Sequence, residues 1–108
     1  MEKLVKKNCI ESLKKPGPPI IIATLPEEAE AIYYACRDHG IKVTAFCDNE
    51  LRRVNKNYCD LNVIHTPELA KHYPKARIII AFFNLDEPSK QLSDLGFNDF
   101  YSPLELLD

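Results

Sequence analysis

The sequence predicts an α/β fold, a three-layer sandwich in which helices cover both faces of a mostly parallel sheet. Short apolar runs without alternation, "IIIA" and "IIIAFF", are typical of strands that are buried on both faces. Segments with apolar residues at helical spacing lie between the apolar runs. Strands that alternate with helices along the chain indicate a parallel sheet with right-handed crossovers.

The chain opens with an expected helix over residues 1–15, because Val5, Cys9 and Leu13 recur at four-residue spacing. Residues 16–19, "PGPP", are expected to form a short stiff connector, since proline fixes φ and removes a backbone donor. Residues 20–108 then form the α/β domain. At 108 residues we expect one compact domain overall.

A βαβ unit is expected directly after the connector. The first strand is Ile20–Ala23, the helix runs from about Pro26 to His39, and the second strand is Ile41–Asp48. Apolar residues of this helix fall at i, i+3, i+4 and i+7, which gives it one face for packing on a sheet. Gly40 is expected to stop the helix.

Three more strands complete the expected sheet: Leu61–His65, the most apolar run Ala76–Phe83, and an edge strand at "DFYS". Thr66 and Pro67 in "TPEL" are expected to cap and open a short helix after the third strand. Another helix is expected over about residues 86–95, with Gly96 as its stop. Numbered along the chain, the five strands should take the order 3-2-1-4-5 of a Rossmann-like fold.

Composition excludes several classes of function. The net charge of −2 offers no basic surface for nucleic acid. No apolar run is long enough to cross a bilayer, and the N-terminus lacks the apolar stretch of a secretory signal, so we expect a cytoplasmic protein. The four cysteines form no Cys-x-x-Cys pair, so buried reduced thiols are expected and no metal site.

Ligands of such folds bind beyond the carboxyl ends of the strands, at the switch point of the sheet. This rule selects candidate cofactor-binding residues after the first, second and fourth strands: Thr24, Leu25, Asp48, Asn49 and Asn84. Asp48 is the most informative, because an acid at the end of the second strand can accept hydrogen bonds from the ribose of a dinucleotide. The alternative is that Asp48 only forms an Asx turn in "CDNE".

The turn after the first strand argues against a usual cofactor. Its residues "TLPEE" contain no glycine, and Glu27 and Glu28 place carboxylates where a phosphate would bind. Thr24 and Glu27 have the spacing of a capping box, although Pro26 also allows the cap to fall at Leu25. No cofactor is therefore expected and, if one binds, it is NAD(P) or a nucleotide-sugar.

Other residues give weaker signals. Arg52 and Arg53 follow the second strand, where basic residues can face the phosphate of NADP, although an exposed loop pair is the commoner reading. No set of side chains suitable for catalysis is evident, because the serines lack a nucleophile-elbow context and Cys47 has no predictable basic neighbour. We therefore predict no catalytic residue in this chain.

The stretch "VTAFCDNELRRVNKNYCDLNVIHTPELAKHYPKARIIIAFFN" and the tail "QLSDLGFNDFYSPLELL" resemble a known module. It is the small Rossmann-like domain found beside FkbM-type methyltransferases, glycosyltransferases and other bacterial enzymes that build or modify surface carbohydrates. The resemblance covers residues 18–107 and includes "F-x-D-N", "T-P-E-L" and "L-x-x-L-G-F". Asp48 and Asn49 match the module's acid and its neighbour, whereas residues 24–28 replace its glycine-containing turn.

This resemblance implies a nucleotide- or sugar-nucleotide-binding fold that serves as an accessory part of a longer enzyme. Two functions follow as alternatives: a non-catalytic accessory domain with a degenerate, glycine-free nucleotide loop, or a working NAD(P) or nucleotide-sugar module that uses Asp48. The expected partner is the remainder of its own polypeptide, from which this chain is expected to be a fragment. A homodimer is expected if Phe97, Phe100 and Tyr101 are exposed at the sheet edge.

Overall fold

The computed structural model describes residues 5–6, 10–23, 28–81, 86–103 and 106. Within these ranges a seven-stranded sheet has the order β1-β7-β6-β2-β3-β5-β4. The strands are β1 (Val5–Lys6), β2 (Ile20–Ala23), β3 (Ala45–Asp48), β4 (Asn57–Tyr58), β5 (Leu61–His65), β6 (Arg77–Ile80) and β7 (Phe100–Tyr101). All neighbouring pairs are parallel except β4 and β5, which are antiparallel.

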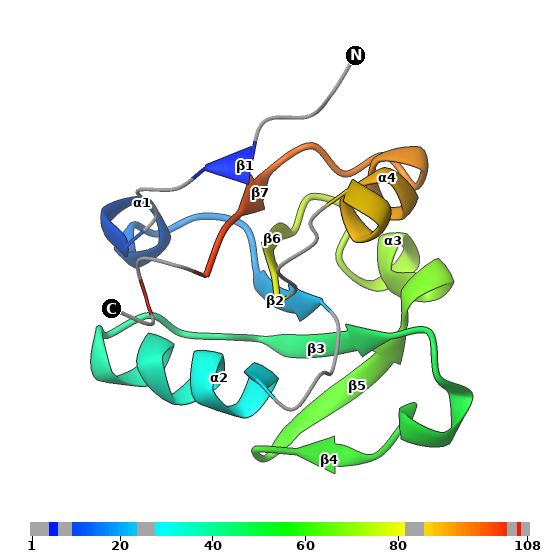
Figure 1. Ribbon diagram of the computed structural model, residues 1–108, viewed down its shortest axis with the longest axis horizontal. Coiled ribbons are helices and arrows are strands. Elements are labelled where there is room, and N and C mark those ends of the chain that lie inside the picture. Colours follow the sequence, from blue (N-terminus) through cyan, green and yellow to red (C-terminus); the bar gives the residue numbers. More distant parts are fainter. Residues whose placement is uncertain (1–4, 7–9, 24–27, 82–85, 104–105, 107–108) are drawn as a thin grey trace.

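The helices lie on both faces of the sheet (Figure 1). They are α1 (Ile10–Lys14), α2 (Glu28–Asp38), α3 (Leu69–His72) and α4 (Asp86–Asp94), with 3-10 turns at Leu51–Arg53 and Thr66–Glu68. The first two helices pack on one face, and α3 and α4 pack on the other. This arrangement is the expected three-layer sandwich.

The five expected strands form the centre of the sheet in the expected order, but the predicted strand count was wrong. Two short strands extend the sheet, β1 beside β7 and β4 beside β5. Val5 pairs with Phe100, so the described part of the expected helix over residues 1–15 is a strand at Val5–Lys6 and a helix at Ile10–Lys14. Pairing with the open edge of β7 outweighs a modest helical periodicity here.

The antiparallel β4–β5 pair was also missed by the sequence analysis. The turn that joins the two strands consists of Cys59 (φ 52°) and Asp60 (φ 62°), and Tyr58 pairs with Leu61 across it. Positive φ at both central residues is the mark of a type I′ hairpin, a turn in which Asn-Gly is preferred. Cys-Asp is not that pair, and no hairpin is predicted here from the sequence.

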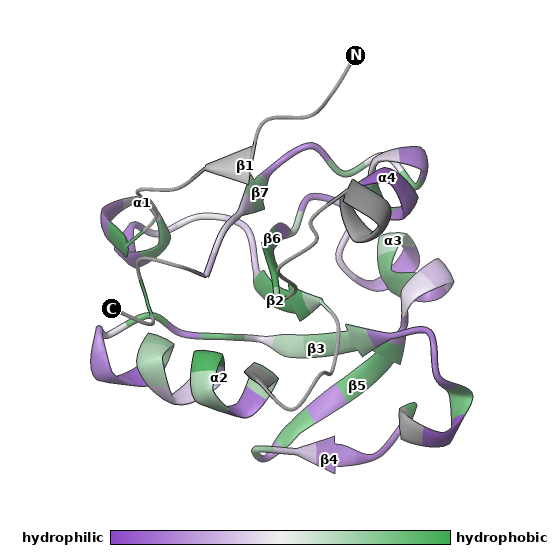
Figure 2. Cartoon of the chain, in the orientation of Figure 1, coloured by the Kyte–Doolittle hydropathy of each residue, from purple (hydrophilic) through white to green (hydrophobic). Residues whose placement is uncertain are grey.

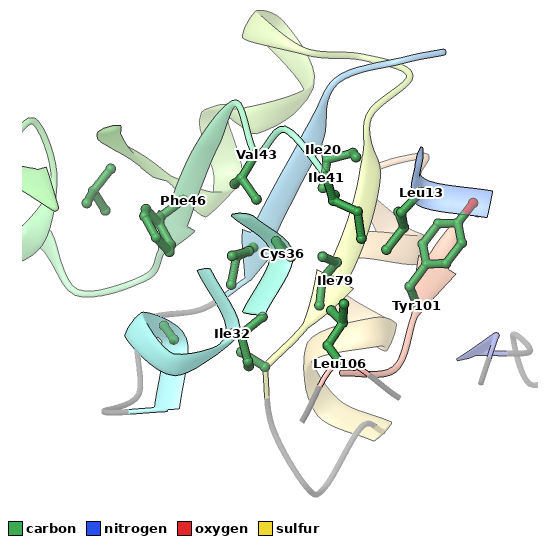
Figure 3. Close-up of a cluster of buried hydrophobic side chains, with 14 residues drawn as sticks. Leu13, Ile20, Ile32, Cys36, Ile41, Val43, Phe46, Ile79, Tyr101 and Leu106 are labelled. Carbon is green, nitrogen blue, oxygen red and sulfur yellow. The ribbon is translucent and has the colours of Figure 1, made fainter. Parts of the chain in front are cut away.

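Two layers of apolar side chains bury the central strands from both faces. Ile20 and Ile22 of β2 belong to the layer on the α2 side, whereas Ile21 and Ala23 belong to the layer on the α3 and α4 side. In Figure 3 the side chains of Ile32 and Cys36 from α2 lie among residues of the sheet. Figure 2 shows apolar β2 and β6 at the centre of the sheet and polar β4 at its edge. The reading of unalternating strands as doubly covered is confirmed.

Helix α2 ends at the residue that the sequence indicated. Gly40 has φ 75°, and the backbone N–H of Ile41 donates to the carbonyl of Cys36 at 2.8 Å. The N–H of Gly40 donates to the carbonyl of Arg37 at 3.1 Å. These two bonds form a Schellman motif, in which glycine takes the left-handed position and the flanking apolar residues, Cys36 and Ile41, pack in one cluster.

Helix α4 ends in the same way. Gly96 has φ 102°, and the N–H of Phe97 donates to the carbonyl of Leu92 at 3.0 Å. Leu92 and Phe97 are both buried in the layer on that side of the sheet. Both expected glycine stops are therefore confirmed, and each returns the chain toward the amino end of a strand.

Arg77 opens β6 and joins α1 to the sheet. The residue is only 8% exposed. Nε donates to the carbonyl of Pro18 at 2.8 Å, and Nη1 donates to the carbonyls of Ser12 at 3.2 Å and Lys15 at 3.0 Å. The guanidinium thus satisfies carbonyls at the end of α1 and in the connector, which otherwise lack intrahelical partners.

The aromatic side chains near the last strand are buried within the chain. Phe97 is 3% exposed, Phe100 0% and Tyr101 2%. The strand β1 covers the edge at which Phe100 and Tyr101 lie. The condition for the expected homodimer, exposed aromatics at this edge, is therefore not met, because intramolecular packing already covers these residues. Among the helices that the structure describes, none has the length and apolarity needed to cross a membrane.

Candidate functional site

The candidate site lies at the carboxyl edge of the sheet, where β2, β3, β5 and β6 end. The strand order reverses between β2 and its two neighbours β3 and β6, which defines the switch point. Three of the predicted site residues, Thr24, Leu25 and Asn84, lie outside the described residues, as does the expected capping box. Asp48 and Asn49 are described, and both lie at this edge.

Asp48 ends β3 opposite His65 of β5, and it is 5% exposed. Its Oδ1 accepts a hydrogen bond from the backbone N–H of Glu50 at 2.8 Å. This is the Asx turn that the sequence analysis offered as the alternative to a ribose contact. The carboxylate is therefore engaged by its own loop, at the position where a dinucleotide-binding fold presents its acid.

Asn49 forms a reciprocal amide pair with Gln91 of α4. Asn49 Nδ2 donates to Gln91 Oε1 at 3.0 Å, and Gln91 Nε2 donates to Asn49 Oδ1 at 2.9 Å. The pair links the loop after β3 to a helix that follows β6, 42 residues along the chain. It therefore connects the two sides of the switch point. Sequence reasoning selected Asn49 but missed Gln91, because nothing local relates two amides so far apart.

Cys47 and Thr66 lie next to this edge in the interior. Burial raises the pKa of the Cys47 thiol from 9.0 to about 12; the Thr66 hydroxyl lowers it in part, and the charge of Asp48 raises it. The Oγ1 of Thr66 is buried and has no hydrogen-bond partner of good geometry among the described residues. Cys47 therefore stays a protonated thiol at neutral pH rather than a nucleophilic thiolate.

Thr66 does not cap the helix after β5, contrary to the sequence prediction. The capping position falls at His65, which makes no side-chain cap bond, and Thr66 is the first residue of the 3-10 turn. Thr66 is 1% exposed, so its side chain contributes to the interior rather than to the helix end. Pro67 does occupy the first turn, as predicted.

The loop after β3 contains an exposed ion pair. Arg52 Nε lies 3.3 Å from Glu50 Oε2, and the Arg52 side chain is 81% exposed. An exposed pair of this kind contributes little to stability. It agrees with the reading of Arg52 as a solvated loop residue.

No group of three or more His, Cys, Asp and Glu side chains that could hold a metal ion occurs in the part of the chain that the structure describes. Cys36 and Cys47 are buried cysteines outside any disulfide, and Cys59 is a half-buried one. The described residues at the carboxyl edge thus offer one buried carboxylate and one amide pair, a set suited to hydrogen bonding.

Comparisons with known proteins give a fold. No family model and no curated protein matches this chain. Among solved structures, the chain is similar to RSP, a Rex-family repressor, with a TM-score of 0.58 and 18% sequence identity. The match covers 86% of this chain and 47% of the repressor chain. At this identity the similarity shows the fold alone, which is a Rossmann-like α/β fold.

Proposed function

We propose that this chain is a non-catalytic Rossmann-like accessory domain of a larger protein, with a degenerate nucleotide site. This proposal rests on the hydrogen bonds that side chains at the carboxyl edge already form within the chain. Asp48 accepts the N–H of Glu50, and Asn49 is paired with Gln91. A ribose that approached this edge would have to compete with these contacts.

The turn that precedes α2 supports the same reading. No glycine occurs between Pro18 and His39, and α2 begins at Glu28. A pyrophosphate at a helix N-terminus needs close backbone approach and a positive field, and acidic residues in the first turn oppose that field. A Rossmann-like sheet without a glycine-containing turn is better suited to packing against another part of the protein than to binding a cofactor.

The proposed partner is the remainder of the same polypeptide. The repressor that shares the fold is about twice as long as the matched region, since the match covers 47% of its chain. Such a fold therefore occurs as part of a longer protein. The resemblance of residues 18–107 to modules beside FkbM-type methyltransferases and glycosyltransferases supports a cytoplasmic bacterial enzyme of carbohydrate or methyl transfer as the context.

Isothermal titration calorimetry with NADH, NADPH and UDP-glucose tests this proposal. We expect no saturable heat for any of the three ligands up to a ligand concentration of about 1 mM, which corresponds to a binding free energy weaker than roughly −4 kcal/mol. The Asp48→Asn variant should behave as the wild type does. Saturable micromolar binding that Asp48→Asn abolishes would refute the accessory reading.

A second candidate function is NAD(P) or nucleotide-sugar binding through Asp48. It is favoured by the position of this carboxylate, which is 5% exposed at the carboxyl end of β3 beside the switch point. Under this reading, Glu27→Gly with Glu28→Ala should tighten nucleotide binding, because repulsion of the phosphates is removed. The same affinity in the double variant and the wild type would count against an anion site at that helix.

A further inference from the structure

A cavity of about 270 Å³ opens at the amino edge of the sheet, opposite the candidate site. Its wall is formed by the connector at residues 16–19, the end of α1, and the residues that enter β2, β3 and β6. Four of its lining residues are cationic: Lys14, Lys15, Lys42 and Arg77. None of the lining residues is acidic, although the whole chain has a net charge of −2.

Arg77 gives this cavity a buried charge as well as exposed ones. Arg77 as a whole is 8% exposed, and its guanidinium donates through Nε and Nη1 to three backbone carbonyls. Within the described part of the chain no carboxylate pairs with it, and Nη2 donates to no residue. Buried charges in proteins are normally paired, so a guanidinium without a counter-ion on the wall of a cavity indicates a place for an anion.

The connector lies against this side chain. A Cβ at Gly17 would lie 3.4 Å from Arg77 Cζ and 3.6 Å from Nη2, which is ordinary van der Waals contact. The carbonyl bonds from both sides fix the plane of the group. Nη2 is the one nitrogen of the guanidinium without an acceptor among the described residues, so its two N–H bonds can donate to a phosphate oxygen.

We propose that this cavity binds the phosphate group of a small phosphorylated molecule, with Arg77 at its base and Lys15 and Lys42 at its mouth. The volume lies just below the usual range for small-molecule pockets, roughly 300–1,000 Å³, which suits a sugar phosphate better than a dinucleotide. The site is independent of the proposed function, because it lies at the opposite edge of the sheet from Asp48.

Titration of the ¹⁵N-labelled chain with inorganic pyrophosphate and with ribose 5-phosphate, followed by NMR, tests the proposal. We expect saturable shifts of the Gly17, Gly40 and Thr44 amides, weaker at high salt. Tighter binding of ribose 5-phosphate would identify a phosphate ester as the ligand class, and tighter binding of pyrophosphate a free polyphosphate. The proposal would be overturned if neither probe gave saturable shifts up to a probe concentration of about 10 mM, which corresponds to a binding free energy weaker than roughly −3 kcal/mol.

Matched charge variants make the assignment specific. Lys42→Gln should weaken binding about fivefold, whereas Lys56→Gln, an exposed lysine near β4, should leave it unchanged. Equal weakening by both would overturn the proposal, as would shifts confined to residues 48–50. Arg77→Lys should weaken binding further; if that variant fails to fold, Lys42→Gln and Lys15→Gln still decide the matter. Asp48→Ala should bind as the wild type does, which separates this site from the carboxyl edge.

Discussion

Replacement of Arg77 by methionine should strongly destabilise the fold. Methionine fills much of the same volume but removes all three hydrogen bonds, at 2.8, 3.0 and 3.2 Å, from the carbonyls of Pro18, Lys15 and Ser12. Hydrogen bonds to a charged group each contribute about 1.5–3 kcal/mol. Lys15 and Pro18 are exposed, so water recovers part of this loss. The expected loss of unfolding free energy is about 3 kcal/mol, a large fraction of the total for a small domain.

Urea denaturation followed by far-UV circular dichroism measures this effect. With a slope of about 2 kcal/mol/M, a loss of about 3 kcal/mol lowers the midpoint by about 1.5 M. Arg37→Met is the matched control, since Arg37 is exposed on α2 and its guanidinium lies 5.4 Å from the centre of the Tyr34 ring. The control should lose less than about 1 kcal/mol. If Arg77→Met loses no more than Arg37→Met, the guanidinium does not hold α1 and the connector to the sheet.

Three further predictions concern stability. Gly40→Ala should lower the unfolding free energy by about 1–2 kcal/mol through backbone strain alone, because a Cβ there meets nothing within 4 Å. Gly40→Asn should lower it less, and equal urea midpoints for the two variants would contradict this prediction. The pKa of Cys47 is raised to about 12 in the fold, so its protonation should stabilise the fold in full below about pH 9 and lose this effect as the pH rises toward 12. Between pH 8 and 10.5 the unfolding free energy of the wild type should fall by about 2 kcal/mol more than that of Cys47→Ala, and parallel pH profiles of the two proteins would contradict this prediction. Asn49→Ala and Gln91→Ala should be non-additive by about 0.5–1 kcal/mol in a double-mutant cycle, and strict additivity would show that the amide pair does not form in solution.

The elements that the sequence predicted correctly depend on short-range chemistry. The apolar runs of β2 and β6 identify central strands, because a strand covered on both faces needs no polar residues. Gly40 and Gly96 identify the helix ends, since the left-handed position of a Schellman motif favours glycine. The order of the five central strands follows from handedness rules that apply to any alternation of strands and helices.

The features that were missed depend on residues distant in the chain or on turns with unusual residues. The turn before β5 places Cys59 at positive φ, where cysteine is not typical, and Asp60 at the second position, where glycine is preferred. The Asn49–Gln91 pair spans 42 residues, and the bonds of Arg77 span 59 to 65. In the sequence Arg77 is only a charged residue near the start of an apolar strand, and its burial follows from the carbonyls that the fold brings to it.

The pairing of β1 with β7 sets the order in which the sheet can be assembled. Val5 pairs with Phe100, and Phe100 is itself aligned with Ile78 of β6. The partner of β1 therefore exists only after nearly a hundred residues have left the ribosome and β7 has joined β6. Closing so long a loop carries a large entropic cost for a strand of two residues. Among the strands that the structure describes, β1 is thus expected to join the sheet after β7 does.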